Sequence, residues 1–100
     1  AFEKLCWALT TPGYLTRLRQ AALEALGRDW AARYFSSTDR WVIEHRGGRV
    51  RVGVLDEEII VHECDRFDFE VATYRFGGKS RAAYAPRALR FASQLAEELS

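Results

Sequence analysis

The sequence predicts an α+β fold, a two-layer sandwich in which helices from both ends of the chain cover one face of a four-stranded antiparallel meander. Apolar and polar residues alternate between Trp41 and Phe76, with short turns between the runs, as in half-buried strands. Apolar residues recur every three or four positions before and after this segment, as in amphipathic helices. One hundred residues, 48% of them hydrophobic, suit one α+β domain over residues 1–100 with a substantial core.

The N-terminal third is predicted to be helical. Apolar residues of the segment 2–9 fall on one helical face, which indicates a short first helix. Thr11 can cap a second helix, with Pro12 at its first position and Gly27 as its stop. The apolar stripe of that helix consists of Leu15, Leu18, Ala22 and Leu26. Residues 28–35 are interpreted as a further helical turn or two, anchored by aromatic side chains.

The first two turns of the meander fix the register of three strands. Gly47-Gly48 is typical of a two-residue turn with positive φ at both positions. It places Ile43 opposite Val52 and Glu44 opposite Arg51. A turn at Asp56-Glu57 then places Val54 opposite Ile59 and Val52 opposite Val61, so apolar residues still face one another.

The third turn needs one residue more. A two-residue loop at Asp65-Arg66 would turn the apolar side chains of the last strand toward water. A three-residue loop, residues 65–67, places Val71 opposite Val61 and Thr73 opposite Ile59. The edge strands of this meander are 41–46 and 69–76, and either edge could pair with a second copy of the chain.

The last helix is predicted to begin at Pro86, because proline suits a first helical turn and disrupts a second one. A short turn then covers residues 81–85. The apolar stripe of the helix consists of Leu89, Ala92, Leu95 or Ala96, and Leu99.

The polar face of the meander is the predicted binding surface. The register lines up Glu44, Arg51, His62 and Glu70 across the four strands, with Arg49, Cys64 and Asp68 in a second row. Two interpretations stay open: a solvated, salt-bridged sheet face, or a surface on which a partner docks. The second assigns partner binding to Arg49, Arg51, His62 and Glu70.

No motif in the chain indicates catalysis, a cofactor or a metal. The glycine pairs lack the spacing of a phosphate-binding loop, and no serine has the flanking glycines of a nucleophile elbow. His62 and Cys64 share a strand face, but the paired spacing of structural zinc ligands is missing. His45 points toward the core near a turn and is expected to have a backbone partner. We therefore expect neither an enzyme nor a metalloprotein.

The net charge and the cysteine content narrow the choice of binding partner and of cellular compartment. A net charge of +1 gives no overall attraction to nucleic acid or acidic membranes, and no apolar run could span a bilayer. Cys6 and Cys64 have no disulfide-framework spacing, which favours two reduced thiols and a cytoplasmic protein.

The C-terminal third resembles a known family. The alternating run Phe67–Phe76, followed by Gly77-Gly78-Lys79-Ser80-Arg81, resembles the last strand and the start of the final helix of a double-stranded RNA-binding domain. That family has the order α–β–β–β–α and contacts phosphates at a helix N-terminus. The resemblance implies RNA binding by the basic residues Lys79, Arg81, Arg87 and Arg90.

The sequence thus favours a non-catalytic protein-binding module, such as an accessory, inhibitor or assembly factor, that acts through its exposed sheet face. The alternative is an RNA-binding domain that uses the basic run from Lys79 to Arg90.

Overall fold

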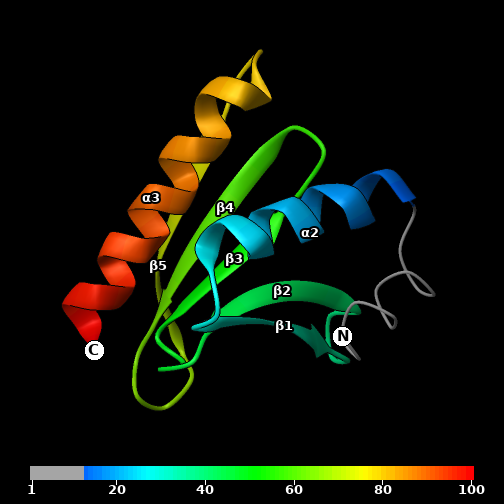
Figure 1. The fold of residues 1–100 in the computed structure, drawn as a ribbon. Helices are drawn as coiled ribbons and strands as arrows, with labels where there is room; N and C mark the ends of the chain where they lie inside the picture. Colours follow the sequence, from blue (N-terminus) through cyan, green and yellow to red (C-terminus); the bar gives the residue numbers. More distant parts are fainter. Residues whose placement is uncertain (1–12) are drawn as a thin grey trace.

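The computed structural model describes residues 13–100, which form two helices and a five-stranded antiparallel sheet. The predicted first helix and the Thr11-Pro12 start of the second lie outside the described residues. Each strand pairs with its neighbour in sequence, so the sheet is a meander of order β1-β2-β3-β4-β5 (Figure 1). The elements are α2 (Gly13–Leu26), β1 (Trp30–Phe35), β2 (Arg40–His45), β3 (Val50–Val54), β4 (Glu58–Cys64), β5 (Glu70–Gly77) and α3 (Arg81–Leu99).

Residues 30–35 form a strand, so the predicted helical turn and the count of four strands are both wrong. Gly27, with φ at +101°, ends α2, and β1 then pairs with β2 along its whole length. Trp30 and Ala32 are buried while Ala31 and Arg33 are exposed, which is the alternation of a half-buried strand. As a result, β1 and β5 are the sheet edges, and residues 41–46 lie inside the sheet.

The predicted register of β2, β3 and β4 is confirmed. Ile43 pairs with Val52, and Val52 pairs with Val61. The first turn differs in detail, because only Gly48 has a positive φ, at +76°. The Gly48 N–H donates to the His45 carbonyl at 2.8 Å, and the strands are joined by residues 46–49. A longer loop of this kind keeps the register while requiring glycine at only one position.

The predicted register of the last strand is wrong. Tyr74, not Val71, pairs with Val61, and a bulge interrupts the pairing next to Cys64. The connecting loop spans residues 65–69, because the Asp65 carboxylate accepts hydrogen bonds from the N–H groups of both Phe67 (2.8 Å) and Phe69 (3.0 Å). This longer loop turns Tyr74 toward the core.

Helix α3 begins at Arg81, five residues earlier than predicted, and contains Pro86 within its second turn. Proline there removes the hydrogen bond to the carbonyl of Ala82. Ala82 is exposed, so water can satisfy that carbonyl. One helical face is buried at four-residue intervals, by Tyr84, Ala88, Ala92 and Ala96.

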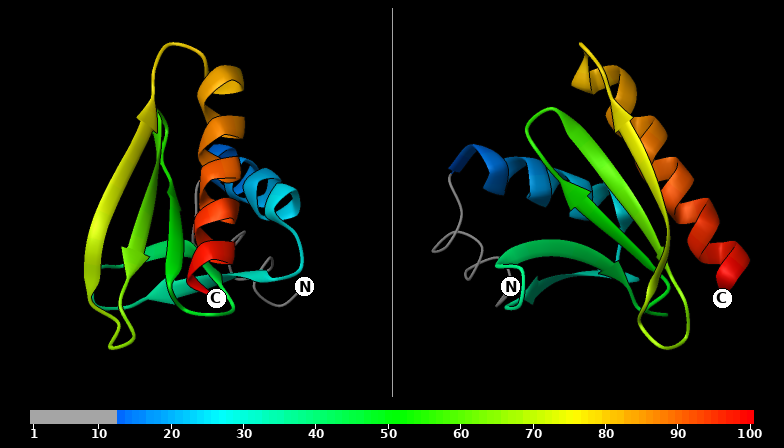
Figure 2. Two further views of the ribbon diagram at one scale, coloured as in Figure 1. Left: turned by 90° about the vertical axis from the view of Figure 1, so that its left-hand side faces the viewer. Right: turned by 180° about the vertical axis from the view of Figure 1, so that it is seen from behind.

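Both helices lie on the same side of the sheet (Figure 2). Helix α3 contacts β3, β4 and β5, whereas α2 contacts β1, β3 and α3. The core between them is built on a central ladder in which Ile43, Val52 and Val61 are almost completely buried. Along residues 13–100, no helix combines the length and apolar character that crossing a membrane requires.

The register of β4 and β5 predicts opposite outcomes for two valines. Val61 is fully buried, and Val71 is 56% exposed. Val61→Asp should unfold the domain, because an unpaired buried charge costs several kcal/mol against a total stability of about 5–15 kcal/mol. Val71→Asp should melt within a few degrees of the parent. Circular dichroism melts of both variants measure this, and a folded Val61→Asp protein would contradict the register.

Candidate functional site

The predicted polar row is present on the sheet face that points away from the helices. Glu44 pairs with Arg51, and Arg51 pairs with His62. The fourth position belongs to Thr73, not to Glu70, because the register of β5 differs from the predicted one. Glu70 still reaches the row from the bulge, where its Oε2 lies 3.1 Å from the Nδ1 of His62. The predicted residues therefore do come together.

Arg51 is the centre of this face. Its Nε donates to Glu44 Oε2 at 2.7 Å, and its Nη2 donates to Asp68. The side chains of Arg51 and Glu44 are only 13% and 15% exposed, unlike those of ordinary surface ion pairs. Burial alone would lower the pKa of Arg51, but its bonds to Glu44 and Asp68 raise it, so the guanidinium stays charged.

Strand β1 contributes two side chains that the sequence interpretation missed. Arg33 donates to Glu44 Oε1 at 2.7 Å, so one carboxylate joins two arginines. Phe35 lies beneath both guanidinium groups, with the Cζ atoms of Arg33 and Arg51 at 4.7 and 4.9 Å from the ring centroid. Guanidinium groups over an aromatic face are attracted to its π electrons. These four residues and Asp68 are called the arginine cluster below.

An open hollow of about 250 Å³ lies beside the arginine cluster. Its wall includes Phe35, Val42, Arg51, His62 and Glu70, so it combines apolar surface with both signs of charge. The Thr73 hydroxyl donates to Glu70 and lowers the pKa of that carboxyl; partial burial opposes this, and His62 adds to the lowering.

The second predicted row is built differently from the first. Arg49 Nε donates to the backbone carbonyl of Cys64 at 2.6 Å, so Arg49 braces the end of β4. Cys64 is 1% exposed, and burial raises the pKa of its thiol. Asp68 has a positive φ of +74° and reaches Arg51 from the β4–β5 loop. These contacts therefore tie the end of β4 and the β4–β5 loop to strand β3.

An exposed apolar patch borders this face. Phe67 is 81%, Phe69 is 69% and Val71 is 56% exposed, and all three lie on the loop that carries Asp68 or at the start of β5. The register predicted from the sequence had placed the Val71 side chain in the core. The signal that could have corrected it is the alternation of Ala72, Tyr74 and Phe76, which supplies an equally apolar inward face.

The basic residues of the RNA-binding alternative lie on the helical side of the molecule. Arg81 is the first residue of α3, and its guanidinium donates to the Leu55 carbonyl and the Tyr84 hydroxyl. Arg81 and Arg90 line a groove between the helices, whereas Arg87 is exposed and outside the groove, and Lys79 lies in the preceding turn. Lys79 and Arg81 line a second hollow together, at the start of α3.

The structure also shows the surroundings of His45 and of the possible metal ligands considered from the sequence. His45 Nδ1 accepts the Gly47 N–H at 3.1 Å, which confirms the expected backbone partner, and its ring meets Trp30 edge-on at 5.0 Å. Within the described part of the chain, no three histidine, cysteine or acidic side chains are grouped so that they could hold a metal ion.

Three comparisons with known proteins gave no match: no family model, no curated protein and no solved structure is significantly similar to the chain. The domain that the C-terminal resemblance implies has three strands, whereas residues 13–100 contain five. The site must therefore be interpreted from its own residues.

The burial of Arg51 predicts an unequal effect of two arginine substitutions. Arg51→Ala should cost about 1–3 kcal/mol, because it leaves a partly buried Glu44 without one of its charged partners. Arg75→Ala removes a comparable ion pair with Glu58 whose arginine side chain is 64% exposed, and should cost less than about 0.5 kcal/mol. Urea denaturation measures both. Equal losses would show that Arg51 is no more buried than an ordinary surface arginine.

Glu70 predicts a dependence of stability on pH. Its pKa is lowered in the folded state, so its contribution is present above the unfolded-state pKa and is lost as the pH falls through the folded-state value. In Thr73→Val the Glu70 pKa should rise, because the hydroxyl donor is removed. The stability advantage of the parent over this variant should therefore shrink on acidification. NMR titration of the carboxyl and melts at neutral and acidic pH test this; an unchanged Glu70 titration would contradict it.

Proposed function

We propose that this chain is a non-catalytic protein-binding module, of the kind that serves as an accessory, inhibitor or assembly factor, and that it binds its partner through the sheet face opposite the helices. The binding surface consists of Arg49, Arg51, His62 and Glu70, together with the adjoining apolar patch of Phe67, Phe69 and Val71. The observation that carries the proposal is the exposure of these three large apolar side chains beside a charged, partly buried cluster.

The apolar patch supplies the reason for a protein partner. Two aromatic rings and a valine, each more than half exposed, lie within five residues of one another in the chain. Large exposed apolar side chains gathered in this way are typical of interaction sites. Aromatic and arginine side chains are also the groups that most often dominate the energy of protein interfaces. Phe67 and Phe69 would serve as the central anchors.

The neighbouring charges define the chemistry of the partner. Arginine and acidic side chains are interspersed on this face and largely neutralise one another, as in the Glu44–Arg51–Asp68 chain. Such a surface gives no strong attraction to a polyanion. It suits a protein surface with an apolar centre and polar groups around it, and the binding should depend only weakly on salt.

The arginine cluster also lowers the entropic cost of binding. Arg51 is held by two carboxylates and by the Phe35 ring before any partner arrives. An arginine that is already ordered loses little side-chain freedom when a partner covers it.

The test compares the parent with two variants in pull-downs from native lysate, followed by titration of the captured protein. Phe67→Ser combined with Phe69→Ser should weaken partner binding at least about tenfold, as the loss of anchor residues usually does. Its thermal midpoint should stay close to that of the parent, because both rings are exposed. Tyr14→Ser, at an aromatic residue of α2 that is 51% exposed, is the control and should bind normally.

A partner that the double variant still captures with parental affinity would refute the role of the patch. Binding of duplex RNA would instead support the alternative, through Lys79, Arg81, Arg87 and Arg90. Four phosphate contacts should make that binding fall about a hundredfold between 50 and 200 mM salt. A second copy that pairs along the free edge of β5 is the remaining outcome, and sedimentation of the purified chain would reveal it.

A further inference from the structure

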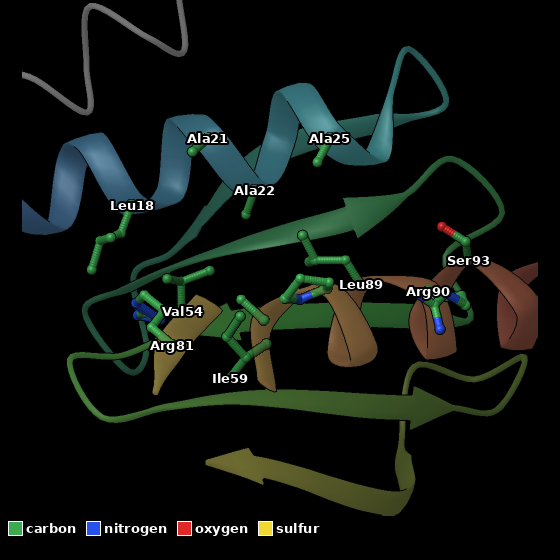
Figure 3. A pocket seen from close by; sticks show the side chains of 12 residues that line it. Leu18, Ala21, Ala22, Ala25, Val54, Ile59, Arg81, Leu89, Arg90 and Ser93 are labelled. Carbon is green, nitrogen blue, oxygen red and sulfur yellow. The ribbon is translucent and has the colours of Figure 1, made fainter. Parts of the chain in front are cut away.

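Helices α2 and α3 enclose a groove above β3 and β4 (Figure 3). The groove lies on the helical side of the sheet (Figure 2), opposite the proposed partner surface. Its volume is about 490 Å³, which falls within the usual range of small-ligand sites. The lining includes Leu18 and Ala22 of α2, Val54 and Ile59 of the sheet, and Ala85 and Leu89 of α3.

The space exists because the facing helix positions are small. Ala21, Ala22 and Ala25 line the groove from α2, and Ala85 faces them from α3. Alanine lets two helices approach closely, and both helices contact β3. From there α2 runs toward β1, whereas α3 runs along β4 and β5, so the two helices diverge (Figure 1). The result is an apolar channel whose floor is the core of the domain.

The polar groups that residues 13–100 contribute to the groove are basic or neutral. This part of the chain lines it with Arg81, Arg90 and Ser93 but with no carboxylate. Arg81 lies with Leu18 and Val54 at one end, and Arg90 and Ser93 lie near Ala25 at the other, with Leu89 between them (Figure 3). No acidic side chain among residues 13–100 forms an ion pair with either arginine.

We propose that this groove binds a free, unbranched, medium-chain carboxylate. The carboxylate lies at the open end, where Arg90 supplies a guanidinium and Ser93 a hydroxyl. The chain extends past Leu89 toward Leu18 and Val54, where it is in contact with apolar side chains throughout. Arg90 and Ser93 lie three residues apart on α3 and therefore on neighbouring positions of one helical face.

Charge complementarity selects an anion. Two arginines that form no ion pair within residues 13–100 repel a cationic amphiphile, and a neutral chain gives them no counter-charge. A carboxylate accepts two parallel hydrogen bonds from a guanidinium, which makes this pairing strong and directional. The Arg81 side chain is held in place by Leu55 and Tyr84, and its Nε is buried without a hydrogen-bond partner among the described residues. It adds positive potential at the far end of the groove.

The experiment is isothermal titration calorimetry of the full chain with sodium decanoate below its micelle concentration. Decanoate should bind at least tenfold more tightly than decyltrimethylammonium, which has the same chain and the opposite charge. Within the series hexanoate, octanoate and decanoate, each added methylene should raise the affinity about fourfold, as expected for complete burial.

Three variants locate the site. Arg90→Gln should weaken decanoate binding about tenfold, whereas Arg87→Gln, on the same helix but outside the groove, should leave it unchanged. Ala25→Leu places a larger side chain at the exposed mouth of the groove and should reduce binding without lowering the thermal midpoint.

The proposal is overturned if the chain does not bind decanoate, if the cationic amphiphile binds equally well, or if Arg87→Gln and Arg90→Gln weaken binding equally. Retention on anionic phospholipid vesicles without binding of free decanoate would also overturn it, because the ligand would then be a membrane surface. Any of these results leaves the protein-binding proposal standing, since that surface lies on the other face of the sheet.

Discussion

The contacts of Arg51 connect the parts of the uncovered sheet face. Its guanidinium, on a central strand, binds a carboxylate of β2, a carboxylate of the β4–β5 loop and the face of an aromatic ring from β1. A largely buried charge is stable only when its partners are in place. The position of the edge strand β1 and the conformation of the loop that displays Phe67 and Phe69 are therefore both linked to one side chain. Without it, Arg33 is the one charged partner that residues 13–100 still offer to Glu44.

The two faces of the sheet offer different chemistry. The helical side contains the core ladder and an apolar groove with basic ends. Such a groove suits an anion that has an apolar chain. The opposite side offers neutralised charge pairs and exposed aromatic rings, which suit a protein surface. Because the sheet separates the two, a ligand in the groove and a partner on the outer face could be bound together. Any effect of one on the other would have to pass through the shared strands β3 and β4.

The sequence predicts the strand register correctly where the alternation of apolar and polar residues agrees with the length of the turns. Val52 and Val61 could be paired from the turns alone, and Arg51 and His62 followed onto the polar face. Two features that shape the polar face were missed. Residues 30–35 combine apolar spacing that fits a helix as well as a strand, and only pairing with β2 decides between them. Asp65 lengthens the third turn by accepting two backbone hydrogen bonds, and this depends on a loop conformation that residue spacing does not reveal. Because of these two errors, Phe35 was not predicted on the polar face, and the exposed apolar patch was not predicted at all.

Strand β1 places Phe35 against Arg51, and the arginine cluster depends on this contact. The most direct measurement is NMR of the isotopically labelled chain, with nuclear Overhauser effects recorded from the Phe35 ring. We expect contacts between that ring and the Arg51 side chain, with extended Cα shifts for residues 30–35. Helical shifts over those residues, without contacts from the Phe35 ring to Arg51, would contradict it.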